Sequence, residues 1–135
     1  MNLVKPSDLD AFVRRYRFAG GVIRLVRYRH RKRQLNVDVV LRVMTAMKSL
    51  SESAKPVKLH LRFVDVEECR FQKRPAKGLA KITEAKFGFF DGLVYANFDA
   101  WGLEPGERPQ IFDFRGSDAF LGAKDLFAAE VAPSA

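Results

Sequence analysis

The sequence predicts a mainly β protein in which antiparallel hairpins form a curved sheet or a sandwich, with one short N-terminal helix. Three observations indicate this class. Apolar residues alternate along 35–47 and 57–63, an Asp91-Gly92 pair separates two further apolar runs, and 12 Phe, 3 Tyr and 1 Trp provide large core side chains. A chain of 135 residues suits one domain, 1–135, with a sizeable core.

The first expected element is a short helix. Ser7 is a suitable cap, and Asp8 and Asp10 place negative charge in the first turn. Gly20-Gly21 is expected to end the helix. Its apolar face follows the helical spacing i, i+3, i+4 and i+7, at Leu9, Phe12, Val13 and Tyr16.

The first expected hairpin joins strands 22–30 and 35–47 through a turn at 31–34. The second strand has one fully apolar face, because every odd position from 35 to 43 holds Leu or Val. Residues 49–56 read as a loop. Residues 57–63 read as another strand, continued over 65–71 after a bulge, since Val64 and Val66 change the apolar phase.

A second hairpin is expected over 82–101. Asp91-Gly92 separates its strands, and this pair suits a type I′ turn, which needs positive φ at both positions. After basic loop 72–80 and turn region 102–109, a strand is expected at 110–115, broken by Gly116-Ser117. Residues 118–131 fit either a helix or a strand followed by a turn at Lys124-Asp125, and the surrounding hairpins favour the strand.

Cysteine content and hydropathy indicate the compartment. Cys69 is the single cysteine, so no intramolecular disulfide can form, which is typical of the reducing cytoplasm. The N-terminal residues lack the pattern of a secretory signal, and no apolar run reaches 18 residues. We therefore expect a cytoplasmic protein that does not contact a membrane.

Positive charge is concentrated at the start of the chain. The net charge is +8. Residues 1–34 hold ten Lys or Arg against Asp8 and Asp10, whereas cations and anions balance in 35–135. This asymmetry points to an anionic partner, such as an acidic protein, nucleic acid or anionic lipid, or else to a solubilising surface.

The candidate partner-binding residues lie on the first expected hairpin: Arg24, Arg27, Arg29, Arg31, Lys32 and Arg33. Guanidinium groups bind phosphate and carboxylate oxygens in pairs. Arg27, Arg29 and Arg31 share one face of the strand, whereas Arg24 and His30 share the other, so the six cannot all meet one ligand. A charged edge strand that blocks aggregation is the alternative reading.

Catalytic chemistry has little support in the sequence. Asp65 and Glu67 could bind a divalent cation or form an acid/base pair, but further ligands cannot be assigned, and ion pairing with nearby lysines and arginines explains them as well. Cys69 and His60 lack the context of a thiol nucleophile. No glycine loop has phosphate-binding spacing. We expect no catalytic residue, no metal and no cofactor.

The run Phe-Asp-Phe-Arg-Gly-Ser-Asp-Ala-Phe-Leu-Gly-Ala-Lys at 112–124, with strand 57–63 and the aromatic segment 87–101, resembles small bacterial β-rich domains grouped with the immunity proteins of polymorphic toxin systems. The resemblance covers about the last two-thirds of the chain. It implies a protein-binding inhibitor without catalysis and transfers no functional residue. The basic charge departs from the acidic charge expected of an inhibitor of a basic nuclease.

The function expected from these observations is a non-enzymatic binding domain, monomeric or homodimeric, with an anionic protein partner. A nucleic-acid-binding domain that uses the basic hairpin 22–34 is the second hypothesis. A metal-dependent enzyme that uses Asp65 and Glu67 is the third.

Overall fold

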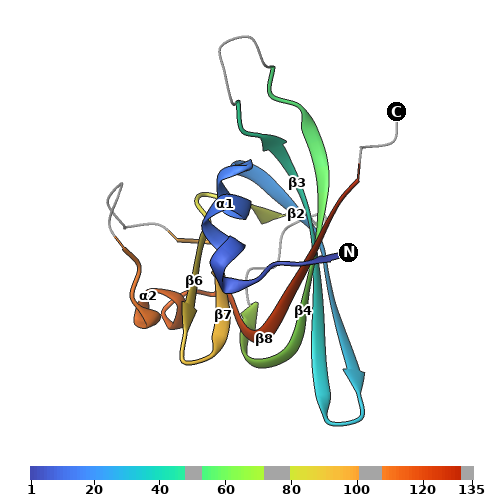
Figure 1. The fold of residues 1–135 in the computed structure, drawn as a ribbon, viewed down its shortest axis with the longest axis vertical. Helices are drawn as coiled ribbons and strands as arrows, with labels where there is room; N and C mark the ends of the chain where they lie inside the picture. The colour runs from blue at the N-terminus through green and yellow to red at the C-terminus, as the bar shows by residue number, and fades with distance from the viewer. Residues whose placement is uncertain (48–52, 72–79, 101–107, 132–135) are drawn as a thin grey trace.

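The computed structural model describes residues 1–47, 53–71, 80–100 and 108–131. It confirms a mainly β fold built as a curved sheet (Figure 1). The described elements are β1 (Asn2–Leu3), η1 (Pro6–Asp8), α1 (Leu9–Arg14), β2 (Tyr16–Arg31), β3 (Gln34–Thr45), β4 (Pro56–Phe71), β5 (Ala80–Lys81), β6 (Lys86–Phe90), β7 (Leu93–Asn97), α2 (Ile111–Arg115) and β8 (Ala119–Val131).

All strand pairs of the described sheet are antiparallel. The order is β5-β2-β3-β4-β8-β7-β6, and β1 pairs with β8 beside this path. The long strands bend at irregularities, because the β2–β3 register shifts twice and the β4–β8 register shifts between Val66 and Glu68. Asp65 has a φ of 58° and lies just before this β4–β8 shift, close to the bulge predicted from the phase change at Val64 and Val66.

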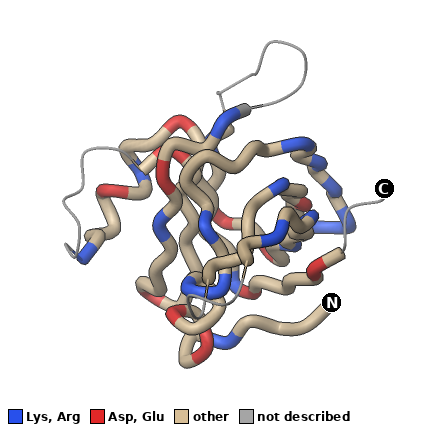
Figure 2. Tube along the Cα trace, turned by 90° about the horizontal axis from the view of Figure 1, so that it is seen from above, with Lys and Arg blue, Asp and Glu red and all other residues tan. Residues whose placement is uncertain are grey.

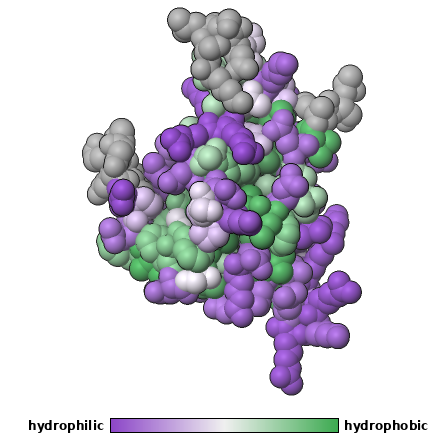
Figure 3. Space-filling model, viewed as in Figure 1, coloured by the Kyte–Doolittle hydropathy of each residue, from purple (hydrophilic) through white to green (hydrophobic). Residues whose placement is uncertain are grey.

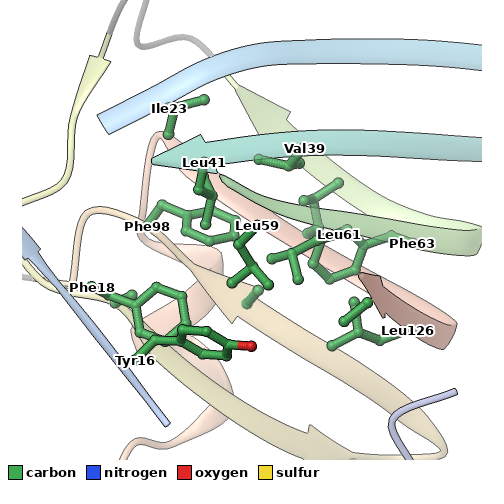
Figure 4. Packing of buried hydrophobic residues seen from close by; sticks show 14 of the residues in the cluster. Tyr16, Phe18, Ile23, Val39, Leu41, Leu59, Leu61, Phe63, Phe98 and Leu126 are labelled. Atoms are coloured by element: carbon green, nitrogen blue, oxygen red, sulfur yellow. The ribbon is translucent and has the colours of Figure 1, made fainter. Parts of the chain in front are cut away.

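The main core lies on the face of the sheet that α1 covers (Figures 1 and 4). Alternate residues of β3 and β4 point into it, among them Val39, Leu41, Leu61 and Phe63, which have essentially no exposed surface. Rings from distant segments also meet there, since Phe87 on β6 contacts Phe12, Phe18 and Phe98. The strict alternation read in 35–43 and 57–63 is therefore the pattern that builds the core.

A smaller core lies on the opposite face of the sheet, beneath α2. Tyr95 and Leu93 of β7 pack there against Phe114 of α2 and Phe120 of β8. The ring centroids of Tyr95 and Phe114 are 5.7 Å apart. The sheet thus buries apolar residues on both faces at its β6–β7–β8 end.

Both predicted hairpins are present. Residues 32 and 33 form the turn between β2 and β3, and their antiparallel pairing runs from Arg31↔Gln34 to Tyr16↔Thr45. Asp91 and Gly92, with φ of 52° and 81°, connect β6 to β7 as a type I′ turn requires. The predicted strand over 118–131 is confirmed as β8, which continues through Lys124-Asp125 without the expected turn.

The predicted N-terminal helix is too long and its cap is wrong. Ser7 lies inside η1, whose N-cap is Lys5, and Asp8 is the N-cap of α1. β2 begins at Tyr16, so Gly20-Gly21 lies within a strand and does not end a helix. Alternation explains the error, because Tyr16 and Phe18 are buried with exposed Arg17 between them, a strand pattern that overlaps the helical one.

The predicted strand at 110–115 is a helix. Gln110 and Asp113 form reciprocal capping-box hydrogen bonds at the start of α2. In one of them the backbone N–H of Gln110 donates to an Asp113 carboxylate oxygen, with 2.6 Å between the nitrogen and the oxygen. The Phe112-Asp113-Phe114 alternation is misleading, since only Phe114 is buried and Phe112 is exposed. Several expected segments lie wholly or partly outside the described residues: most of the loop at 72–80, most of the turn region 102–109, Trp101 and part of the loop 49–56. Ala80, the last residue of the expected loop 72–80, belongs to β5.

Gly21 permits the close approach of β2 to β3. A Cβ atom at this position would lie 2.8 Å from both the Arg42 carbonyl oxygen and Val43 Cγ1. We expect Gly21→Ala to destabilise the fold by about 1–3 kcal/mol, because the backbone must move. Gly116→Ala, which meets only the Phe112 carbonyl oxygen at 3.3 Å, is the control and should have a smaller effect. Urea unfolding of both variants measures the difference, and equal losses would contradict the prediction.

Candidate anion-binding hairpin

The end of the β2–β3 hairpin projects from the molecule as a two-stranded ribbon. β3 pairs with β4 only from Val37 to Met44, so the preceding residues 34–36 pair with β2 alone. Figure 1 shows this end extending below the rest of the sheet, and hydrophilic side chains cover it in Figure 3. The six residues predicted to bind a partner, Arg24, Arg27, Arg29, Arg31, Lys32 and Arg33, are all exposed and lie on or beside this ribbon. We call the segment 22–34, which carries these six residues, the basic hairpin.

The ribbon has two chemically different faces. Arg27 pairs with Asp38 of β3 and Arg29 pairs with Asn36, so these four side chains lie on the outer face of the sheet, away from the main core. Alternation along β2 places the Arg31 side chain on the same face. Tyr28 and His30 point to the core side of the sheet. Arg24 stands at the register shift between Ile23 and Leu25, and Lys32 and Arg33 form the turn.

Asp38 lies at the base of the basic hairpin on the same outer face. Its side chain is only 3% exposed, and three cationic or titratable side chains surround it. Arg62 Nε lies 2.9 Å from Oδ1, whereas Arg29 Nη2 and His60 Nε2 each lie 3.5 Å from Oδ2. The His60 Nε2 atom is buried and has no hydrogen-bond partner in the described structure.

The charges around Asp38 determine its ionisation. Burial raises the pKa of the Asp38 carboxyl group, but the hydrogen bond from Arg62 and the charges of Arg62, His60 and Arg29 outweigh burial and hold the pKa below its ordinary value of 3.8. The hydrogen bond to Asp38 in turn raises the pKa of Arg62. Asp38 is therefore a carboxylate at neutral pH and partly neutralises Arg29.

Four other cations of the basic hairpin are not neutralised by a described carboxylate. Among the described residues, no carboxylate lies within ion-pair distance of Arg27, Arg31, Lys32 or Arg33. Elsewhere in the molecule, acidic and basic positions interleave along the chain (Figure 2). Part of the uncompensated positive charge predicted from the sequence therefore lies on one projecting ribbon.

Sequence reasoning overlooked the role of Asp38. The available signal was a lone acid between Val37 and Val39 in the middle of a buried strand, with Arg or His in the same phase on the neighbouring strands. Only the register shows that Asp38 lies between Arg27 of β2 and Arg62 of β4.

A second ion pair, also unexpected from the sequence, ties α2 to the sheet. The Arg115 guanidinium donates to both oxygens of Glu68, with its Nε 2.7 Å and its Nη2 3.0 Å away. The Tyr95 hydroxyl donates to the same carboxylate. The hydrogen bond from Arg115, opposed by burial and assisted by the bond from Tyr95, lowers the pKa of Glu68. This cluster is structural, because it connects α2 with β4 and β7.

The acidic residues considered for metal binding face a lysine. Lys124 Nζ lies 3.2 Å from an Asp65 carboxylate oxygen and 3.9 Å from a Glu67 oxygen. Within the described ranges, no three His, Cys, Asp or Glu residues are grouped as metal ligands would be. The observed ion-pair partner of these surface acids is therefore Lys124 of β8, a cation distant in the sequence, whereas the sequence pointed to cations near them in the chain.

Cys69 and His60 are not brought together. Burial raises the pKa of the Cys69 thiol, opposed by a hydrogen bond with Tyr28. Cys69 is opposite Leu121 and packs at the core, whereas His60 contacts Asp38 on the outer face. The thiol and the imidazole thus lie on different faces of the sheet.

No family model, no curated protein and no solved structure matches this chain. No helix in the described parts of the chain combines the length and the apolar character needed to cross a membrane. The fold and the basic hairpin define an antiparallel β-sheet domain with a positively charged, projecting ribbon.

Proposed function

We propose that this protein is a non-enzymatic binding domain and that its basic hairpin contacts an anionic surface of a partner protein. The observation that supports this proposal is the projecting ribbon, on which Arg27, Arg31, Lys32 and Arg33 are exposed and have no ion pair with a described carboxylate. Such a surface raises the association rate with an acidic partner and opposes contact with a basic one. The resemblance to immunity-protein domains also favours a protein partner, and the free Cys69 thiol suits an encounter in the cytoplasm.

Nucleic acid is the second candidate partner. A two-stranded ribbon with arginine on one face has dimensions that fit a major groove. The aromatic residue of the ribbon lies elsewhere, because Tyr28 points to the core side and hydrogen-bonds with Cys69. The arginine face therefore lacks the stacking platform typical of single-strand binders, and double-stranded nucleic acid is the form to test.

Removal of charge from the basic hairpin tests the proposal. We expect a labelled acidic peptide to bind the wild-type protein at low salt, and Arg27→Ala/Arg31→Ala/Arg33→Ala to weaken binding by about tenfold or more, since three exposed charge contacts are lost. Fluorescence anisotropy at two salt concentrations measures both affinities. Duplex DNA and RNA serve as the competing probes, for which each lost phosphate contact lowers the salt slope by about 1.

A variant with the same loss of charge elsewhere provides the control. Arg14, Arg70 and Arg108 are exposed and lie outside the basic hairpin, so their triple replacement by alanine should leave affinity nearly unchanged. Equal weakening in both variants would show that only net charge matters. If neither acidic peptide nor nucleic acid binds the wild-type protein at low salt, the proposed function is wrong.

A further inference from the structure

We propose that the edge of β2 accepts an extended acidic segment of the partner protein as an additional strand of the sheet. This inference rests on the proposed function, because it specifies how the anionic protein partner is recognised. It goes further, since an added strand requires backbone hydrogen bonds as well as charge.

Among the described residues, no strand covers the edge of β2 along the basic hairpin. β3 occupies one side of β2, whereas β5 pairs on the other side only with Val22 and Ile23. From Arg24 to Arg31, no described strand pairs with this side. Pairing with β3 is regular from Leu25 to Arg31, so the open segment is a straight ladder rather than a series of bulges.

The tight turn determines which backbone groups face the open side. Residues 32 and 33 form a two-residue turn, so the flanking Arg31 and Gln34 exchange both backbone hydrogen bonds. Every second residue back from Arg31 bonds to β3 in the same way. The intervening Val26 and His30 therefore direct their N–H and C=O groups toward the open edge, in the same phase as Tyr28.

The side chains specify the charge of the incoming strand. Arg27, Arg29 and Arg31 stand at alternate positions on the outer face, and an added strand would place its own alternate side chains beside them. Acidic residues at every second position of the incoming segment would pair with this row. Arg29 already forms an ion pair with Asp38, whose Oδ2 lies 3.5 Å from Arg29 Nη2. Arg27 and Arg31 are therefore more available than Arg29 to bind the acidic residues of the added strand.

The same row disfavours a second copy of this chain at the edge. Two β2 edges paired together would place arginines beside arginines, and like charges opposite each other destabilise a strand pair. A nucleic acid backbone could pair with the arginines, but it has no regularly alternating donors and acceptors to complete the ladder. An acidic peptide strand satisfies both the charges and the backbone groups.

Substitution at His30 separates strand addition from charge attraction. The His30 N–H points away from β3, so His30→Pro removes a donor only from the open edge, and proline is tolerated on edge strands in this orientation. His30→Ala is the matched control, since it also removes the imidazole but keeps the N–H. The probe is the peptide Thr-Glu-Val-Glu-Val-Glu-Thr, capped at both ends, and a peptide of the same composition with contiguous glutamates serves as its control.

We expect His30→Pro to weaken binding of the alternating peptide about tenfold or more, and His30→Ala to change it less than about twofold. Hydrogen exchange by NMR gives an independent readout in the unsubstituted protein. Saturating peptide should slow exchange of the Val26 and His30 amides, whereas the amides of Arg27 and Arg29 are already protected by β3. Circular dichroism tests whether His30→Pro remains folded. If this variant unfolds, the hydrogen-exchange measurement on the unsubstituted protein still tests the proposal.

Each outcome distinguishes this inference from the proposed function. If both peptides bind equally, depend on Arg27 and Arg31, and leave the Val26 and His30 amides unprotected, strand addition is refuted and charge-driven protein binding stands. Binding of duplex DNA or RNA alone would overturn the acidic strand as the occupant. The absence of any anion binding at low salt would remove both proposals.

Discussion

Replacement of Phe63 by alanine is expected to lower the free energy of unfolding by about 3–5 kcal/mol. Phe63 lies in the middle of β4 with 0% of its surface exposed, paired with Val37 on one side and Leu126 on the other (Figure 4). Truncation removes the favourable transfer of the ring from water and leaves a cavity in the main core. The strands on both sides are held in register, so they cannot close the cavity completely.

The control for Phe63 is the same substitution at an exposed site. Phe112 is 67% exposed on α2, so Phe112→Ala should change the free energy of unfolding by less than about 0.5 kcal/mol. Urea unfolding monitored by circular dichroism measures both variants. A loss at Phe63 of less than about 1 kcal/mol would mean that this ring does not lie in the core.

The second large effect is expected at Asp38. We expect Asp38→Asn to destabilise the protein by about 2–3 kcal/mol at pH 7, because the buried carboxylate accepts a charge-assisted hydrogen bond from Arg62 and offsets the charge of Arg29. The estimate is at the low end for a buried ion pair, since about a third of the Arg62 side chain and 48% of the Arg29 side chain are exposed.

The destabilisation by Asp38→Asn should depend on pH. The pKa of Asp38 in the folded protein is below 3.8, so the stabilisation is fully present above about pH 5 and is lost as the pH falls through the folded-state pKa. The difference in free energy of unfolding between wild type and variant should therefore shrink below about pH 5. Urea unfolding at pH 7 and pH 3 tests this, with Asp118→Asn at an exposed position as the control. A difference that is constant with pH would contradict the assigned role of Asp38.

The sequence predicted where the charged residues of the candidate site lie, because the charge of a residue does not depend on its tertiary contacts. The excess of Lys and Arg before residue 34 located the basic hairpin, and alternation placed Arg27, Arg29 and Arg31 on one face. The contacts of these residues could not be read in the same way. Arg29 and Arg62 are 33 positions apart in the chain, and they meet at Asp38 only because β2, β3 and β4 pair in one particular register.

By itself, the sequence determined the hairpins and the apolar face of the sheet. Alternation at 35–43 and 57–63 and the Asp91-Gly92 turn are local signals, because a strand has a period of two residues and a type I′ turn has specific φ angles. Only the tertiary structure decided the segments whose local signals conflict. Residues 16–21 join β2 because Tyr16 and Phe18 fill the core beneath α1, and 111–115 form a helix because Phe114 packs on Tyr95 of β7. In such short segments, burial against distant residues contributes more free energy than the difference between the intrinsic preferences for helix and for strand. Those distant residues cannot be identified from the local sequence pattern.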